Sequence, residues 1–181
     1  MNLDAVDPPH GEDAVLVAVQ STLVGRPGVL DGARALSHFG EHSAGWVGVS
    51  LLGALLQPSR RRAWLTAGVG AFVAHAAAVV IKRVVKRTRP DHPAIAVNVG
   101  TPSRLSFPSA HATSTTAAAI LLGRVTGLPL PLVLVPPMAL SRLVLGVHYP
   151  SDVLTGVVVG TAVAKTVGAL SDRAEKEKQR P

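Results

Sequence analysis

The sequence predicts an all-α fold, a polytopic membrane helical bundle of about five spans that short amphipathic interfacial helices precede. Three observations predict it. Hydrophobic residues make up 48% of the 181 residues, whereas charged residues make up only 16%. The mean hydropathy is +0.35. The apolar residues also fall into runs separated by glycine, proline and arginine clusters, which is typical of helices that cross a bilayer.

The charge of the chain is basic, with 18 lysines and arginines against 11 acidic residues and a net charge of +7. A basic chain often binds nucleic acid, but here the charge lies at the ends of apolar segments. This position favours anionic lipid headgroups and a phosphate site over nucleic acid. The chain has no cysteine, which excludes disulfides and thiol chemistry. The start of the chain is acidic, so we expect internal spans and not a cleavable signal peptide to drive insertion.

The first forty residues predict a tail and two short helices. Residues 1–12 are polar and contain proline, so we expect a flexible tail. Residues 13–24 carry apolar side chains at helical spacing but are too short and polar to span, which predicts an amphipathic interfacial helix. The glycine- and proline-rich residues 25–28 end it. Residues 29–39 predict a second amphipathic helix.

Two spans follow. Residues 40–57 form the first, with Trp46 near its start as an interface anchor. The three arginines at residues 60–62 end it and mark the cytoplasmic side. Residues 64–81 form the second, which is long enough to cross an apolar core because a helix rises about 1.5 Å per residue. His75 lies inside this span, where we expect a neutral imidazole bonded to a neighbouring helix; the alternative is a proton relay.

The second half of the chain predicts a loop and three more helices. Residues 91–107 are the loop. A helix then runs from Pro108 to Val125, with Ser109 as its N-cap, and its polar residues 113–116 should face the bundle interior.

A turn at residues 127–129 leads into the next span, residues 130–145, in which two consecutive prolines predict a kink. Residues 153–170 form the last span. Residues 171–181 are charged, so we expect a disordered tail there. The membrane-embedded domain is therefore expected at residues 13–170.

Polar residues interrupt the apolar run of residues 141–152 at Arg142, His148 and Asp152. Charges beside an apolar run are costly unless they are paired or bind something charged, so this pattern indicates a phosphate site. Arg142 offers a fork of donors to phosphate. His148 could act as nucleophile or base, with Asp152 holding its tautomer. The alternative is a helix end with a surface arginine and a capping aspartate.

Two further motifs lie upstream of this stretch. In the first, Lys82 precedes Arg89-Pro90 by six intervening residues, and the second is the run Pro108-Ser109-Ala110-His111. In this order the three motifs resemble the signature K-x6-R-P, P-S-G-H and S-R-x5-H-x3-D of the type 2 phosphatidic acid phosphatase and vanadium haloperoxidase superfamily. The resemblance covers residues 82–152. It departs from the signature at Ala110, where the family usually has glycine.

The resemblance implies a role for each motif residue. His148 would attack phosphorus and form a phosphohistidine, Asp152 would orient His148, and His111 would protonate the leaving alcohol and then activate water. The phosphate would be bound by Lys82, Arg89, Ser109 and Arg142. The resemblance implies neither a metal nor another cofactor, because three basic side chains take the place of a metal ion.

The predicted topology brings all three motifs to one face of the cell membrane. The arginines at residues 60–62 mark the opposite face as cytoplasmic, so the motifs are expected on the extracytoplasmic face. We expect Arg83, Lys86 and Arg87 to contact lipid headgroups there. His38, Glu41 and His42 have the spacing of metal ligands. They and Arg104 are candidates for lining the substrate entrance. The alternative for residues 37–43 is a solvated connection between helices.

The expected function is hydrolysis of a membrane lipid phosphate. The segment of residues 37–46 and its short N-terminal helices are similar to the decaprenyl-phosphoryl-phosphoribose phosphatases of arabinan-building bacteria, so the resemblance implies that substrate. Alternatives are undecaprenyl diphosphate, phosphatidylglycerophosphate and phosphatidic acid. A vanadium haloperoxidase and a silent membrane scaffold are alternatives of other classes. The size and spans argue against the first, and the intact motifs argue against the second.

Overall fold

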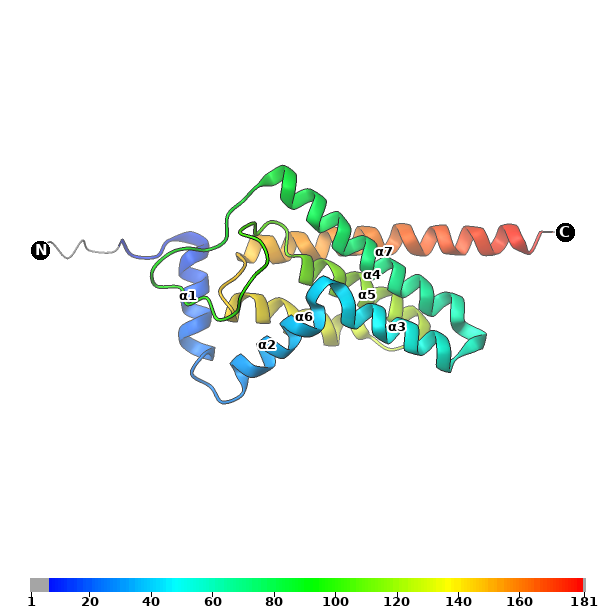
Figure 1. The fold of residues 1–181 in the computed structure, drawn as a ribbon, viewed down its shortest axis with the longest axis horizontal. Helices are drawn as coiled ribbons and strands as arrows, with labels where there is room; N and C mark the ends of the chain where they lie inside the picture. The colour runs from blue at the N-terminus through cyan, green and yellow to red at the C-terminus, as the bar shows by residue number, and fades with distance from the viewer. Residues whose placement is uncertain (1–6, 181) are drawn as a thin grey trace, which may run out of the picture.

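The computed structural model describes residues 7–180, and these residues form a bundle of α-helices (Figure 1). The predicted all-α class is confirmed, since residues 7–180 contain only one isolated β-bridge, between Thr88 and Leu105. Short 3₁₀ turns at Glu41–Ser43 and Pro58–Arg60 precede the third and fourth helices. The helices are α1 (Gly11–Leu23), α2 (Val29–Gly40), α3 (Ala44–Leu56), α4 (Arg61–Val85), α5 (Ala110–Thr126), α6 (Leu130–Val144) and α7 (Pro150–Lys178).

Helix α5 is the centre of the bundle, and it packs against α4, α6 and α7. Its residues 112–119 are buried without exception, so the prediction that residues 113–116 face the interior is confirmed. The helix begins after Ser109, the predicted N-cap, and ends at Gly127, whose φ of 76° closes the turn before α6. In Figure 1, α1 and the long loop between α4 and α5 lie together at one end of the molecule.

Helix α7 meets α5 along a stripe of small residues. Gly156, Gly160, Ala164 and Gly168 recur every four residues and are all buried. A Cβ atom on Gly160 would lie 2.4 Å from the Thr113 carbonyl oxygen, so only glycine permits this approach. Asp152 begins the same stripe. The close packing therefore carries Asp152 to the start of α5, where its carbonyl oxygen accepts a hydrogen bond of 2.9 Å from the Ser109 N–H.

The N-terminal helices form where the sequence predicts them, and a buried glutamine joins α1 to the bundle. Gln20 donates from Nε2 to the carbonyl oxygens of Ala96 (2.7 Å) and Val144 (3.1 Å), and its Oε1 accepts from the Ala96 N–H. The predicted flexible tail of residues 1–12 extends too far, because α1 already begins at Gly11 and the Glu12 carboxylate is hydrogen-bonded. Residues 1–6 of that tail lie outside the described residues.

The prediction for Trp46 as an interface anchor is wrong. Its side chain is only 6% exposed, its Nε1 donates to Thr115 Oγ1 at 3.0 Å, and its ring packs edge-on against Phe39. The cause is the backbone before α3. His42 and Ser43 have φ values of 50° and 59°, which ends the α2 helical path and turns the start of α3 inward. Helix α3 therefore begins at Ala44 and not at residue 40.

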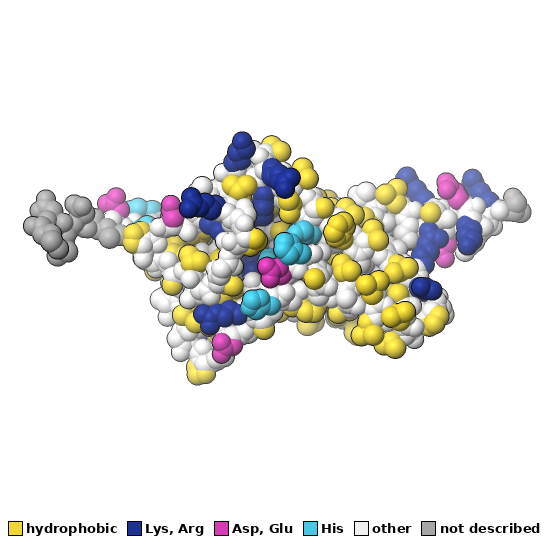
Figure 2. All heavy atoms as spheres, in the orientation of Figure 1, with side chains coloured by type: hydrophobic (Ala, Val, Ile, Leu, Met, Phe, Trp, Pro, Cys, Tyr) yellow, Lys and Arg dark blue, Asp and Glu magenta, His cyan; other side chains and the backbone are white. Residues whose placement is uncertain are grey.

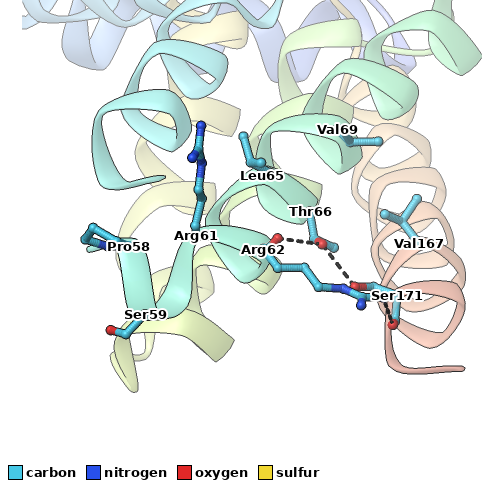
Figure 3. Close-up of a pocket in the computed structure, with 9 residues that line it drawn as sticks. All are labelled: Pro58, Ser59, Arg61, Arg62, Leu65, Thr66, Val69, Val167 and Ser171. Carbon is cyan, nitrogen blue, oxygen red and sulfur yellow. Dashed lines mark hydrogen bonds between the residues drawn. The ribbon is translucent and has the colours of Figure 1, made fainter. Parts of the chain in front are cut away.

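The C-terminal residues are helical to Lys178, so the predicted disordered tail is wrong. The residues of this tail are good helix formers, and α5 and α4 hold its first turn. Asp172 accepts from Arg124 at 2.8 Å, and Arg62 donates to the Ser171 carbonyl oxygen at 2.6 Å. Figure 3 shows Arg62 and Ser171 at a surface pocket between α4 and α7, near the N-terminal end of α4. The pocket has a volume of about 600 Å³.

Two helical segments are long and apolar enough to cross a membrane, Pro58–Val85 and Pro150–Lys178. Helix α6 is apolar but shorter, and it contains both prolines of the predicted kink. Large apolar side chains are exposed along α3, α4, α6 and α7, including Leu55, Leu56 and Leu132, each at least 70% exposed. Exposed apolar surface on this scale marks contact with a membrane or another apolar partner.

A substitution in the small-residue stripe tests the packing of α7 on α5. Because a larger side chain at Gly160 must push the two helices apart, Gly160→Val should lower the free energy of unfolding by about 1–3 kcal/mol. Thermal unfolding in detergent micelles would show this as a fall of several degrees in Tm. Val158→Leu, at a position of α7 that is 68% exposed, is the control. Equal Tm values for the two variants would contradict this packing.

Candidate active site

A cavity of about 540 Å³ opens between the end of α2, the C-terminal half of α4, the loop of residues 99–105 and the start of α5. Figure 2 shows dark-blue basic and cyan histidine side chains gathered near the middle of one face. Eight of the eleven candidate site residues named from the sequence line this cavity: His38, Glu41, His42, Lys82, Arg89, His111, Arg142 and His148. Residues from all three motifs therefore meet at one place.

His148 lies at the base of the cavity, between Arg89 and Asp152, and is 2% exposed. Its Nε2 lies 3.3 Å from Arg89 Nη1, which can only donate, so Nε2 is the unprotonated nitrogen. Its Nδ1 faces Asp152 Oδ2 at 3.5 Å. Burial, together with the positive charges of Arg89, Lys82 and Arg142, holds the pKa of His148 well below its ordinary value. The ring is therefore a neutral base whose Nε2 lone pair faces the Arg89 guanidinium in the cavity wall.

Asp152 is fully buried behind His148, and two groups fix its carboxylate. Oδ2 accepts from the Tyr149 N–H at 2.8 Å, and Oδ1 accepts from Arg87 Nη1 at 3.0 Å. The first bond caps the start of α7, and the second pairs the charge. The carboxylate that faces His148 is therefore held by its own helix and by a cation.

Arg87 and Glu12 are the members of this network that the sequence did not reveal. Arg87 donates to Asp152, to Ser151 Oγ and to Glu12 Oε2, and its guanidinium lies 4.0 Å from the centre of the Tyr149 ring. Arg87 therefore forms ion pairs inside the protein, which the expected contact with lipid headgroups did not include. Glu12 also accepts from the Ser151 N–H at 2.8 Å, which ties α1 to α7.

The charges of this network stabilise one another. Burial alone would lower the pKa of Arg87, but the hydrogen bond to Glu12 and the charge of Asp152 outweigh it and raise the pKa. Burial alone would raise the pKa of Glu12, but the hydrogen bonds from Ser151 and Arg87 lower it. Both groups therefore stay charged across the neutral range.

Lys82 and Arg89 shape the loop that covers the site. Lys82 Nζ donates to the carbonyl oxygens of Leu105 (3.1 Å) and Ser106 (2.7 Å). Arg89 donates to the Ser103 carbonyl oxygen at 2.8 Å and the Val147 carbonyl oxygen at 2.6 Å. Burial lowers the pKa of Arg89 to about 10, an effect that the nearby Asp152 charge opposes. The guanidinium is cationic at neutral pH.

Arg142 brings a free donor to the cavity. It is 2% exposed, its Nη1 donates to Ser37 Oγ and its Nε donates to Ser141 Oγ, both at 3.1 Å. Its Nη2 atom is buried and finds no hydrogen-bond partner among residues 7–180. A buried guanidinium with an unused donor beside a cavity is suited to bind an anion there.

His111 is held by the last turns of α2. Its Nε2 lies 2.9 Å from the Ser37 carbonyl oxygen, which can only accept, so Nε2 carries the proton. A Cβ atom on Gly40 would lie 2.8 Å from His111 Cδ2, so glycine is required for this approach. Ser37 thus positions both His111 and Arg142, a role that the sequence pattern did not indicate.

Besides Asp152, which lies behind His148, two predicted residues do not reach the cavity. Arg104 is exposed, and it contributes to the site only through its carbonyl oxygen, which accepts from the Arg89 N–H. Ser109 is buried, and its Oγ caps α5 by accepting from the Ala112 N–H at 3.4 Å. Ala110, the departure from the family signature, is the first residue of α5 and lines the cavity. Its backbone is helical, so the methyl group brings no strain.

The histidines do not assemble a metal site. No group of three histidine, cysteine, aspartate or glutamate side chains with the arrangement of metal ligands occurs within residues 7–180. His38 Nδ1 lies 4.0 Å from Glu41 Oε2 in an exposed pair, which is a weak surface contact. The metal-ligand spacing of His38, Glu41 and His42 in the sequence therefore does not translate into a chelating arrangement.

Comparison with known proteins places this geometry in a family. The model of the PAP2 superfamily matches residues 63–175. A decaprenylphosphoryl-5-phosphoribose phosphatase of Mycolicibacterium smegmatis is 78% identical over 150 residues, which cover 83% of each chain. The protein of the same name from Mycobacterium tuberculosis (strain H37Rv) is 70% identical over 172 residues, which cover 95% of each chain.

Two solved structures share the fold. The transmembrane PAP2 type phosphatidylglycerolphosphate phosphatase from Bacillus subtilis superposes with a TM-score of 0.69 at 20% identity, over 88% of this chain and 86% of that one. Aquifex aeolicus LpxE superposes with a TM-score of 0.62 at 19% identity, over 85% of this chain and 92% of that one. At this identity the likeness concerns the arrangement of the helices.

The protonation state of His148 can be measured by NMR of ¹³C-labelled histidine. Because a lowered pKa keeps the ring neutral to lower pH, the His148 resonance should not move between about pH 7.5 and about pH 5.5. Orthovanadate should raise the pKa, because an anion beside the ring favours the imidazolium. His148→Gln assigns the resonance. A midpoint near the ordinary histidine value without anion would contradict the electrostatics described above.

Proposed function

The chain belongs to the PAP2 superfamily, and on this basis we propose that it is a membrane lipid phosphatase that hydrolyses decaprenylphosphoryl-5-phosphoribose. Relatives that are 70–78% identical over most of their length bear that activity in their names, and this observation carries the choice of substrate. The assembled cavity supports the reaction class. The product would be a polyprenyl-linked ribose, a precursor for arabinan in the cell envelope.

The phosphate monoester at ribose C5 binds among three cations. Lys82, Arg89 and Arg142 surround the place where its oxygens lie, and Arg142 Nη2 supplies an unused donor. The transition state of phosphoryl transfer spreads charge over the equatorial oxygens, and preorganised cations stabilise it. These side chains do what a metal ion does in other phosphatases, so we assign no cofactor. Ser109 acts indirectly, by fixing the start of α5.

His148 is the nucleophile in this mechanism. Its Nε2 lone pair attacks phosphorus while Nδ1–H faces Asp152, which stabilises the positive ring that forms. The bond between phosphorus and the C5 oxygen breaks, and that oxygen keeps the electron pair. In the substrate complex His111 is an imidazolium, because the nearby phosphate dianion favours its second proton. His111 gives this proton to the leaving oxygen.

Water completes the cycle. His111, now neutral, removes a proton from a water molecule, and the hydroxyl oxygen attacks the phosphorus of the phosphohistidine. The bond between phosphorus and Nε2 breaks, inorganic phosphate leaves, and His148 regains its lone pair. The Ser37 carbonyl oxygen holds His111 in one orientation through both steps.

We propose a multi-pass arrangement in which residues 13–170 form the membrane domain, with about five spans and the cavity on the extracytoplasmic side. Only two helical segments within residues 7–180 are long enough to span by themselves. Helices α3 and α6 also expose large apolar side chains that no other part of the described chain covers, and this exposure supports further spans. The arginines of residues 60–62 support the orientation, because basic residues concentrate on the cytoplasmic side.

Phosphate release from a lipid panel tests the proposed activity. Purified protein in detergent with chelator should release phosphate from decaprenylphosphoryl-5-phosphoribose in preference to undecaprenyl diphosphate, phosphatidylglycerophosphate and phosphatidic acid. His148→Ala should lower kcat by about a thousandfold or more, because it removes the nucleophile. His10→Ala, an exposed histidine outside the cavity, is the matched control. Preference for another lipid would overturn the substrate, and a fully active His148→Ala would overturn the mechanism.

Sidedness can be tested with single cysteines, because the chain has none of its own. Arg104→Cys lies in the exposed loop beside the cavity, and Ser59→Cys lies before α4 at the other end of the bundle. A membrane-impermeant maleimide added to intact cells should label Arg104→Cys and should label Ser59→Cys only after lysis. The reverse pattern would place the cavity in the cytoplasm.

A further inference from the structure

Two histidines of the cavity wall have no part in the mechanism above. His42, from the turn between α2 and α3, and His75, from the middle of α4, both line the cavity. Their rings meet edge to face, with centroids 5.5 Å apart and planes at 65°. Cyan histidine side chains beside a magenta carboxylate are visible near the centre of the face in Figure 2. Two imidazoles thus converge on the space next to the phosphate residues.

His75 is costly where it lies. It belongs to a helix apolar enough to cross a membrane, and alanines occupy the positions on either side of it. An ionisable side chain at such a depth usually has a function. The expectation that it bonds a neighbouring helix is wrong, because its buried Nδ1 has no hydrogen-bond partner in the part of the chain that the structure describes. An apolar side chain would fill this place without burying an unpaired polar atom.

His42 is held toward His75 by an unusual backbone. Its φ is 50°, and that of the next residue, Ser43, is 59°. Two consecutive non-glycine residues in the left-handed region are uncommon, and such strain concentrates at binding sites. The strained turn places His42 and its neighbour Glu41 on the cavity wall. The protein therefore maintains this wall against a conformational cost.

The position of the pair relative to the phosphate residues indicates what it binds. His75, Val79 and Lys82 line the cavity from one face of α4. His75 precedes Lys82 by two helical turns, about 10 Å along the axis. The substrate group next to the scissile phosphate would lie between Lys82 and His75, with the phosphate among the cations on one side of it and the lipid tail in the bilayer on the other.

The chemistry of this wall suits hydroxyl groups and not a second anion. A neutral imidazole offers one donor and one acceptor, as a hydroxyl does, whereas a phosphate oxygen only accepts. Glu41 adds a carboxylate, which accepts from hydroxyls and repels anions. We infer that His42 and His75, with Glu41, form a subsite that hydrogen-bonds the hydroxyl groups of the sugar attached to the scissile phosphate. This inference rests on the proposed function.

A substrate analogue and a substitution together test the subsite. The substrates are decaprenylphosphoryl-5-phosphoribose and its 2,3-dideoxyribose analogue, which keeps both phosphates and the lipid. Wild-type protein should have a higher kcat/KM for the ribose substrate, because the analogue has no hydroxyl groups to hydrogen-bond the polar groups of the subsite. His75→Leu should lower kcat/KM for the ribose substrate about 10- to 100-fold, mainly through KM, and leave that for the analogue unchanged. The preference should then vanish.

Further variants separate recognition from packing. His75→Gln keeps a donor and an acceptor and should restore part of the preference. Val79→Ala, on the same wall, should change both substrates alike because it removes no hydrogen bond. His42→Asn tolerates the left-handed backbone but is too short to reach the sugar, so it should lower the preference even where His75→Leu fails to fold.

The outcomes distinguish the subsite from the activity on which it rests. If wild-type protein hydrolyses the ribose lipid and His75→Leu and His42→Asn keep the full preference for ribose, the subsite is overturned and the phosphatase stands. An equal loss on both substrates also overturns it. If wild-type protein releases no phosphate from the ribose lipid but does so from another lipid of the panel, the proposed substrate fails, and the sugar subsite fails with it.

Discussion

The rest of the site depends on the environment of the Asp152 carboxylate. It is the one fully buried acidic side chain within residues 7–180, and it faces Arg87, the Tyr149 N–H and His148 at once. Its helix reaches α5 only because glycines line the contact. The small-residue stripe of α7 therefore sets where the carboxylate lies, 3.5 Å from His148 Nδ1.

Charge explains why the cavity suits an anion. Lys82, Arg89 and Arg142 converge beside His148, while Arg87 already neutralises Asp152 from the other side. Carbonyl oxygens of the covering loop accept from Lys82 and Arg89, whereas Arg142 Nη2 has no hydrogen-bond partner within residues 7–180. Buried cations without enough counter-charge are stabilised when a phosphate dianion enters, so the electrostatics favour binding and then stabilise the charge of the transition state.

The sequence predicted the helices and the cavity residues well where local chemistry decides the outcome. Amphipathic spacing placed α1 and α2, and the three motifs placed Lys82 and His148. It failed where distant segments decide. The ion pair of Arg87 with Glu12 joins residues 75 positions apart, and no local pattern announces it. Trp46 is buried because of a left-handed turn before α3 that no glycine marks. The first turn of the predicted tail, at Ser171 and Asp172, is held by contacts with α4 and α5.

The most direct test of this account is to trap the covalent intermediate and locate its phosphate. Substrate labelled with ³²P at the C5 phosphate would be mixed with enzyme and quenched in alkali, and the labelled peptide would be sequenced by mass spectrometry. Because Nδ1 faces Asp152 and the Nε2 lone pair faces the cation Arg89 in the cavity wall, the account predicts phosphate on Nε2 of His148. Phosphate on Nδ1 of His148, or on His111, would contradict it.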